Sequence, residues 1–369
     1  MRIGLPREIK DGECRAGLTP TGVAAIIAAG HPVCVERGAG AGSGFADADY
    51  RDAGAGIGDT AAAWDTQLVV KVKELQPPEF GLARRGQILF CYQHLAPEPA
   101  LLQALLSAGA SCIAYETVSD GRDGLPLLAP MSQIAGRLAP LMGAEALQIK
   151  NGGSGVLLPG APGVPAGDVL IIGAGHAGGN ACHVALGLGC KVTVMASSRP
   201  RLDALERAYG AALRTALATP ELIASSVAAA DLVIGAVLRP GRLSPKLISR
   251  SLLRRMRPGS ALVDIGIDQG GIAETSRPSS HSQPFYIEEG IVHYCVPNMP
   301  AACARSATLA LSAATLPYVL SIATTGLAGA IAADPGLGSG LQLHQGRVTC
   351  AKLAQDTGRP LGAYDALAA

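Results

Sequence analysis

The residues that most clearly indicate chemistry form a glycine-rich turn after an apolar segment. The run DVLII at 168–172 continues as Gly173-Ala-Gly175-His176-Ala177-Gly178. In this spacing the first glycine permits a tight turn, the second lets the backbone approach a pyrophosphate, and the third lets the next helix pack on the strand. The N–H groups at the start of that helix then bind phosphate. The pattern predicts a dinucleotide site that includes all five named residues; a similar turn that had lost its ligand would show the same spacing.

The end of the following strand predicts which dinucleotide is bound. A carboxylate normally stands there, where it binds the ribose hydroxyls of NAD and repels a 2′-phosphate. In this sequence the expected strand 191–195 is followed by Ala196, Ser197, Ser198, Arg199 and, after Pro200, Arg201. Arginine suits a phosphate because it donates paired, charge-assisted hydrogen bonds. We expect NADP in preference to NAD. The alternative is that both arginines are solvated and that NAD simply binds less well.

Polar residues beside apolar strands in the first 128 residues are candidates for substrate chemistry. Lys71 and Lys73 continue the run 68–70, and the two-residue period of a strand would place both on one face. His94 follows the apolar run ILFCY, at a strand end, where α/β domains place functional residues. Taken alone, His94 fits a structural role and Arg15 a surface loop.

The alternation of strand-like and helix-like segments predicts an α/β fold with two Rossmann-like, doubly wound domains. We expect a substrate domain that begins with 1–128, a dinucleotide-binding domain over 129–304, and a return to the substrate domain over 305–369. The expected strands are 2–6, 32–36, 68–73, 87–91, 112–114, 169–172, 191–195, 232–237, 261–265 and 291–294. The expected helices are 19–29, 47–53, 97–107, 132–148 and 178–188.

Composition excludes several classes of protein. The 369 residues are 49% hydrophobic and 16% charged with a net charge of +1, which excludes charge-driven disorder and gives no nucleic-acid footprint. The nine scattered cysteines contain no CxxC pair, which indicates reduced thiols in a cytoplasmic protein. No group of His, Cys and Asp has metal-ligand spacing, so we expect no catalytic metal.

One segment has the length of a membrane span. Residues 306–333 carry no charge, but they are weakly apolar, contain Pro317, and lack an aromatic belt or a basic flank. We therefore expect a buried helix, no membrane partner, and a cytoplasmic location without a leader segment.

Taken together, the sequence resembles the alanine dehydrogenase family over nearly its whole length. The matching segments are IGLPREIKDGECRAGLTPTGV, GAGAGSGFADADY, VVKVKE, QILFCYQHLAPEP, AYETV, LPLLAPMSQIAGRLA, GVLLPGAPGV, ADLVIGAVLRPG, DIGIDQGG and YCVPNMPA. The resemblance implies an active site in the cleft between a discontinuous substrate domain and a Rossmann domain. It also implies a homo-oligomer, usually a hexamer, that converts L-alanine, water and NAD(P)⁺ reversibly to pyruvate, ammonium and NAD(P)H.

The resemblance implies a role for four residues. Arg15 would bind the substrate carboxylate, Lys73 would polarise the keto group, and His94 would act as general acid and base. Asp268 would orient the reacting water or ammonia; a loop or helix-capping carboxylate is the alternative. Near the cofactor the resemblance adds Ser132, Val237, Leu238, Ile267, Asn298 and Met299. It gives no role to Lys71.

Departures from the family pattern leave alternatives open. Members commonly have an Asp where Ala196 stands, a valine where Arg239 stands, and a VPKTST-like run at 303–308. The last difference lies near the return to the substrate domain, so a related dehydrogenase or imine reductase for another small amino or 2-oxo acid is one alternative. A non-catalytic nucleotide-binding protein is another, and Lys73 and His94 argue against it. The transhydrogenases share the N-terminal pattern but lack both residues.

Overall fold

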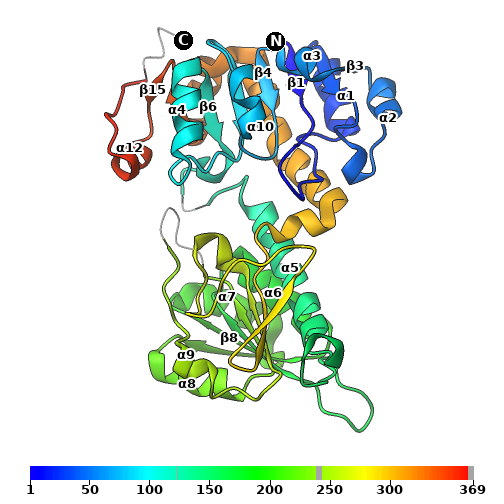
Figure 1. Cartoon of the computed structure of the whole chain (residues 1–369), viewed down its shortest axis with the longest axis vertical. Helices are drawn as coiled ribbons and strands as arrows, with labels where there is room; N and C mark the ends of the chain where they lie inside the picture. Colours follow the sequence, from blue (N-terminus) through cyan, green and yellow to red (C-terminus); the bar gives the residue numbers. More distant parts are fainter. Residues whose placement is uncertain (123, 238–242, 365–369) are drawn as a thin grey trace. The chain divides into compact units, whose positions relative to one another are not determined.

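The computed structural model describes residues 1–122, 124–237 and 243–364. Its contacts divide the chain into two compact units (Figure 1). Unit 1 comprises Met1–Met131 and Cys303–Ala369, and unit 2 comprises Ser132–Ala302. Each unit has a mainly parallel sheet with helices beside it, which confirms the predicted α/β fold with two doubly wound domains.

Unit 1 contains an eight-stranded sheet in the order β15-β14-β6-β5-β4-β1-β2-β3. The strands are β1 (Ile3–Leu5), β2 (Val33–Glu36), β3 (Gly56–Gly58), β4 (Leu68–Val70), β5 (Ile88–Cys91), β6 (Ser111–Ala114), β14 (Leu341–His344) and β15 (Arg347–Val348). The six strands from β6 to β3 are parallel, whereas β14 and β15 add an antiparallel edge. The order places a topological switch between β1 and β4.

Some helices of unit 1 begin at a side chain that caps them. They are α1 (Pro20–Ala28), α2 (Asp47–Asp52), α3 (Thr60–Trp64), α4 (Pro99–Ala108), α10 (Ala304–Ala333), α11 (Pro335–Gly338) and α12 (Ala351–Thr357). Thr19 caps α1 by accepting a hydrogen bond from the Gly22 N–H, as its position before Pro20 predicts. The expected helix 19–29 is thus confirmed within one residue at each end.

Unit 2 contains a seven-stranded sheet in the order β12-β13-β11-β10-β7-β8-β9. The strands are β7 (Asp168–Ile172), β8 (Lys191–Ala196), β9 (Leu213–Leu217), β10 (Leu232–Gly235), β11 (Ala261–Asp264), β12 (Phe285–Glu288) and β13 (Ile291–Tyr294). Among the described strands of this sheet, the β12–β13 pair alone is antiparallel. The helices are α5 (Ala129–Ala146), whose first residues belong to unit 1, α6 (His176–Gly187), α7 (Arg199–Tyr209), α8 (Pro220–Ala229) and α9 (Arg250–Leu253).

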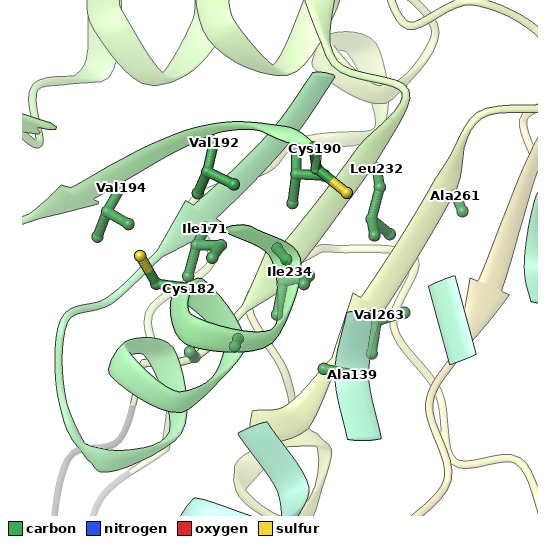
Figure 2. Packing of buried hydrophobic residues seen from close by; sticks show 14 of the residues in the cluster. Ala139, Ile171, Cys182, Cys190, Val192, Val194, Leu232, Ile234, Ala261 and Val263 are labelled. Atoms are coloured by element: carbon green, nitrogen blue, oxygen red, sulfur yellow. The ribbon is translucent and has the colours of Figure 1, made fainter. Parts of the chain in front are cut away.

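Alternate residues of each central strand in unit 2 pack into two separate cores. Ile171 of β7 belongs to the core that α5 and α6 cover, whereas Ile172 packs with residues of α8 and α9. Figure 2 shows the first core, in which Cys182 lies near Val194 and Ala139 lies near Val263. A parallel sheet requires helices on both faces, which is why DVLII is continuously apolar.

The charge-free segment forms α10, which packs in unit 1. Its buried residues recur at helical spacing, from Ala307 and Leu311 to Ile322 and Ala330, and the helix bends at Gly326, whose φ is 74°. Figure 1 shows α10, in orange, among the blue and cyan elements of unit 1. Of the described helices, the one at 299–333 has the length and hydropathy of a membrane span. The spacing of its buried residues is that of a helix whose one face packs on a protein core.

Several elements escaped sequence-based expectation. The strand expected at 68–73 ends at Val70, so the regular alternation proposed for Lys71 and Lys73 is wrong. Strand β3 is short and contains two glycines, which makes its strand propensity low. Strand β14 pairs with β6 across more than half the chain, and local patterning carries no information about such a partner.

Hydroxyls on α10 hold the loop that carries Arg15. The Ala16 N–H donates to Thr308 Oγ1 at 3.1 Å, and Ser43 Oγ lies 2.7 Å from the same atom. One turn along, the Thr19 N–H donates to Ser312 Oγ at 3.0 Å. The 303–308 segment, which departs from the family pattern, therefore supports the neighbourhood of Arg15.

Replacing Thr308 with valine should destabilise the protein. The variant keeps the shape but leaves the buried Ala16 N–H without its acceptor, a loss of about 1–3 kcal/mol. The free energy of unfolding, measured by urea denaturation, should fall for T308V and stay near wild type for T308S. The control T325V removes an exposed hydroxyl that bonds only within α10. Equal stability of T308V and T325V would contradict this account.

Candidate active site

Three of the four candidate catalytic residues follow neighbouring parallel strands of unit 1. Arg15 follows β1, Lys73 follows β4 and His94 follows β5, and these strands are adjacent in the sheet. In doubly wound sheets, ligands bind beyond the carboxyl ends of the strands at the switch point, which here lies between β1 and β4. These residues lie far apart in the sequence, and the strand order brings the segments that carry them to one edge of the sheet.

Arg15 is not the surface residue that its loop position suggested. Only 2% of it is exposed, and its Nε and Nη2 donate to the two oxygens of Glu13, at 2.7 and 2.5 Å. Nη1 donates to the sulfur of Met131 at 3.1 Å. Burial alone would lower the pKa of Arg15, but the Glu13 carboxylate holds it above its ordinary value. Glu13 and Met131 thus fix the orientation of the guanidinium.

Lys71 belongs to a buried ion cluster. Its Nζ lies 2.8 Å from Glu79 Oε1 and 3.2 Å from Glu8 Oε2, and its side chain is 1% exposed. Burial alone would lower the pKa of Lys71, and the two carboxylates raise it above its ordinary value. Glu8 in turn accepts hydrogen bonds from the Val72 N–H at 2.6 Å and the Lys73 N–H at 3.4 Å. Lys71 therefore acts structurally, through Glu8, on the segment that carries Lys73.

The side chains of Lys73 and His94 both lie near the ring of Tyr92. The Nζ of Lys73 lies 6.0 Å from the centroid of the Tyr92 ring. The His94 imidazole is nearly parallel to the same ring, with centroids 6.1 Å apart, and about half of its side chain is exposed. Tyr92 is itself fixed because its hydroxyl donates to the Leu127 carbonyl at 2.7 Å. An accessible imidazole held in this way can exchange protons with a substrate.

The glycine-rich turn of unit 2 has the geometry that a pyrophosphate requires. Gly173 has a φ of 115°, and a Cβ on it would lie 2.3 Å from the Ala236 carbonyl oxygen. A Cβ on Gly178 would lie 1.8 Å from the Gly173 oxygen, so helix α6 can approach β7 only without one. A Cβ on Gly175 would have Arg201 Nη1 as its nearest neighbour, at 3.7 Å. The space before the first turn of α6, at His176 and Ala177, thus fits a dinucleotide phosphate.

Other predicted cofactor residues surround this turn. Helix α5 carries Ser132 and contacts the glycine-rich segment at Gly136, one helical turn after Ser132. A Cβ on Gly136 would lie 2.1 Å from the Ala177 oxygen. Val237 follows β10, and a Cβ on Gly173 would lie 3.2 Å from its nitrogen. Leu238 lies outside the described residues, as does Arg239.

Asp268 lies in an exposed turn anchored by a buried carboxylate. The turn Ile265–Gln269 follows β11, and within it Ile267 is buried. Asp264 Oδ2 accepts hydrogen bonds from the Ile272 N–H at 2.7 Å and the Ser276 hydroxyl at 2.6 Å, which closes the loop around Asp268. Burial raises the pKa of Asp264.

Asn298 and Met299 follow β13 in unit 2. Asn298 has a φ of 55°, a left-handed conformation that Asn adopts more readily than most residues, and Met299 is buried. β13 is the neighbour of β11, so the segments that carry both residues begin at the same edge of the sheet as the turn of Asp268.

The two arginines after β8 differ in their partners. Ala196 ends the strand and is buried, and Ser198 is the N-cap residue of α7 but makes no side-chain capping bond. Arg199 is paired with Asp203 and Glu206, at 2.6 Å each. Arg201 has no ion pair within the described chain, and its Nη1 is the atom beside Gly175. Arg199 therefore fits the solvated alternative, whereas Arg201 lies by the phosphate turn.

Two family models together match most of the chain. The family model described as "Alanine dehydrogenase/PNT, N-terminal domain" matches residues 4–135, and "Alanine dehydrogenase/PNT, C-terminal domain" matches residues 139–351. The chain belongs to the alanine dehydrogenase/PNT family. This confirms the predicted resemblance, and the family implies a nicotinamide cofactor.

Individual relatives cover almost the whole chain. The alanine dehydrogenase of Halomonas elongata is 48% identical over 97% of this chain and 97% of its own length. That of Bacillus subtilis (strain 168) is also 48% identical, over 97% and 95%. A solved L-alanine dehydrogenase superposes with a TM-score of 0.94 at 46% identity, covering 97% of this chain and 99% of its own. A transhydrogenase from Sinorhizobium meliloti shares the fold, with a TM-score of 0.83 at 24% identity over 94% and 100%.

Sequence reasoning missed the carboxylates behind the candidate residues. Glu13 pairs with Arg15, Glu8 and Glu79 pair with Lys71, and Glu116 lies beside His94. Each stands in or near a segment that was already singled out, but an acidic residue near a strand end gives no sign of burial. Among the described residues, no three His, Cys, Asp or Glu side chains are arranged to hold a metal ion.

Replacing Lys71 with methionine should destabilise the protein strongly. The change leaves Glu8 and Glu79 buried without their cation, which costs about 3–5 kcal/mol. The matched control is K352M, which removes an exposed pair with Asp356 that contributes about 0–1 kcal/mol. Urea denaturation of the two variants measures both losses. Similar losses in K71M and K352M would show that the buried cluster is not needed for stability.

Proposed function

We propose that this protein is an NAD(P)-dependent alanine dehydrogenase, which converts L-alanine and water reversibly to pyruvate and ammonium. The observation that carries the proposal is the convergence of Arg15, Lys73 and His94 at the carboxyl ends of β1, β4 and β5. The near full-length identity of 48% to the Halomonas elongata alanine dehydrogenase supports the choice of substrate. A binding-only protein would have no use for an acid/base histidine beside two cations.

In the proposed reaction, Arg15 and Lys73 position the substrate. Arg15 binds the carboxylate through its charge while Glu13 keeps the guanidinium in place. Lys73 donates to the keto oxygen of pyruvate and draws electrons from that carbon. The bound nicotinamide supplies the hydride acceptor for Cα of alanine, or the hydride donor in the reverse direction. Fixing the substrate in this way makes hydride transfer effectively unimolecular.

His94 and Asp268 carry the proton chemistry of the proposal. Alanine first loses one ammonium proton to solvent, because only the neutral amine can give up the hydride from Cα. His94 then takes a proton from the water that adds to the imine carbon and gives it to the nitrogen of the resulting carbinolamine. Ammonia leaves with the hydroxyl proton as ammonium, so the net protonation of His94 does not change. Asp268 orients that water and stabilises the cationic imine. The exposed position of both side chains fits groups that must reach a substrate.

Replacing Lys73 with methionine should remove activity and leave cofactor binding intact. The variant lacks the proton donor to the keto group, and we expect kcat for pyruvate amination to fall by at least about 100-fold. Rates are followed by nucleotide absorbance, and cofactor binding by quenching or enhancement of NAD(P)H fluorescence. The control K352M should match wild type. Retained activity in K73M would remove Lys73 from the mechanism.

NADP preference is the finer part of the proposal, and Arg201 supports it. The absence of a carboxylate at Ala196 removes repulsion, the Ser197 and Ser198 hydroxyls offer donors, and the Arg201 guanidinium lies by Gly175. Arg199 contributes less, because Asp203 and Glu206 already neutralise it.

Steady-state kinetics with pyruvate and ammonium test this preference. We expect a higher kcat/KM for NADPH than for NADH, and we expect R201Q to lower the NADPH value about 10-fold or more while changing NADH little, since only the phosphate loses a partner. R199Q should change neither value by more than about twofold. Faster turnover of wild type with NADH would contradict the NADP proposal and leave the dehydrogenase proposal standing.

A dehydrogenase for another small amino or 2-oxo acid is the second candidate. The observation that favours it is the departure at 303–308, since Arg305 in that run donates to the Ser43 and Gly44 carbonyls, and the Ser43 hydroxyl donates to the Cys14 carbonyl beside Arg15. A panel of 2-oxo acids with ammonium separates the two candidates by kcat/KM.

We further propose that the protein is cytoplasmic and forms a homo-oligomer, a hexamer by family resemblance. Sedimentation velocity measures the oligomeric state.

A further inference from the structure

Glu116 lies beside the segment that carries His94 because two neighbouring strands end together. Strands β5 and β6 are parallel and pair Cys91 with Ala114, so the residues beyond them leave the sheet side by side. The main-chain N–H groups of Gln93 and His94 both point at the Glu116 carboxylate. Gln93 N lies 3.2 Å from each oxygen, and His94 N lies 2.8 Å from Oε1.

This contact explains an unusual backbone conformation. His94 has a φ of 43°, in the left-handed region that a residue with a side chain rarely adopts. Two successive N–H groups that converge on one anion favour such a turn. A strained residue persists only where its surroundings hold it, and here the carboxylate supplies that hold. Glu116 therefore sets the direction in which the chain presents the imidazole.

The same carboxylate also faces the ring. Nδ1 of His94 lies 3.7 Å from Glu116 Oε1, and the ring stacks on Tyr92. Three titratable groups are near the imidazole. They are Glu116 from the end of β6, Tyr92 from the segment that also carries His94, and Lys73, whose Nζ lies 6.0 Å from the centroid of the Tyr92 ring. Of these, only Glu116 is an anion directed at Nδ1, and its side chain is 17% exposed, which limits screening by water.

We propose that Glu116 is the positioning residue of His94. It holds the left-handed turn and keeps a proton on Nδ1, so that Nε2 is the atom that exchanges a proton with substrate. Nε2 takes one proton when water adds and gives it to the departing nitrogen, while the Nδ1 proton and the Glu116 charge stay unchanged. An anion behind the ring stabilises the imidazolium that forms between these steps. This inference rests on the proposed function, in which His94 is the acid/base group.

The test compares E116Q and E116D with wild type. The amide oxygen in E116Q still accepts the two N–H bonds, so the backbone anchor survives and the charge is lost. We expect kcat to fall about 10–100-fold, as for other groups that orient a histidine, with KM for pyruvate within about twofold. E116D, which keeps the charge, should recover part of kcat.

Two measurements separate this role from a structural one and from failure of the proposed function. Histidine ¹³C-labelled NMR, with the His94 signal assigned by its loss in H94N, reports without any turnover which ring nitrogen carries the proton. The signal should show the Nδ1–H tautomer in wild type and a larger share of the Nε2–H tautomer in E116Q. The control is E98Q, which removes an exposed carboxylate four residues after His94 and should match wild type in rate and tautomer. An unchanged tautomer in folded E116Q overturns the inference even if wild type is active. A wild type inactive with every oxo acid, with a changed tautomer in E116Q, overturns the proposed function alone.

Discussion

The structure of unit 1 depends on the burial of charge at the carboxyl ends of its central strands. Arg15 and Lys71 are both about as inaccessible as core leucines, and a buried cation persists only with anions in contact. Glu13 meets this need for Arg15, and Glu8 and Glu79 meet it for Lys71. The carboxylates do a second task, since Glu8 also accepts the N–H groups of the segment that carries Lys73. The ion pairs that make burial possible thus fix the positions of the groups that would meet a substrate.

Unit 2 meets a different constraint, which is steric. Its phosphate turn needs backbone where a side chain would collide, and Gly173 and Gly178 leave that room against Ala236 and against each other. Asp264 plays the part that the glutamates play in unit 1, closing a loop through main-chain donors while its own charge is buried at a cost. In both units a buried carboxylate behind the strand ends orders the segment that carries a candidate reactive group.

Sequence reasoning reached the fold and the cofactor turn because both depend on local patterns. The apolar run DVLII followed by spaced glycines specifies strand, turn and helix with little help from the rest of the chain. Local pattern alone indicated a surface position for Arg15, because the partner that buries it, Glu13, looks like any other acidic loop residue. The partners of Lys71 and His94 were missed for the same reason: Glu8 and Glu116 reach them through strand order, which places segments 64 and 22 residues apart side by side. Arg199 and Arg201 could be separated only once helix α7 showed which of them meets Asp203 and Glu206.

The return of the chain into unit 1 also bears on the order in which the protein can form on the ribosome. Unit 2 is contiguous, so all of its strands have been synthesised once Ala302 emerges. Unit 1 lacks α10 at that moment, and with it Thr308 and Ser312, the hydroxyls that hold the loop of Arg15. The edge strands β14 and β15 come later still. Unit 2, which would bind the dinucleotide, can therefore fold first. Until β14 is synthesised, the N-terminal segment of unit 1 has an unpaired sheet edge at β6. An unpaired edge favours binding by chaperones over early assembly.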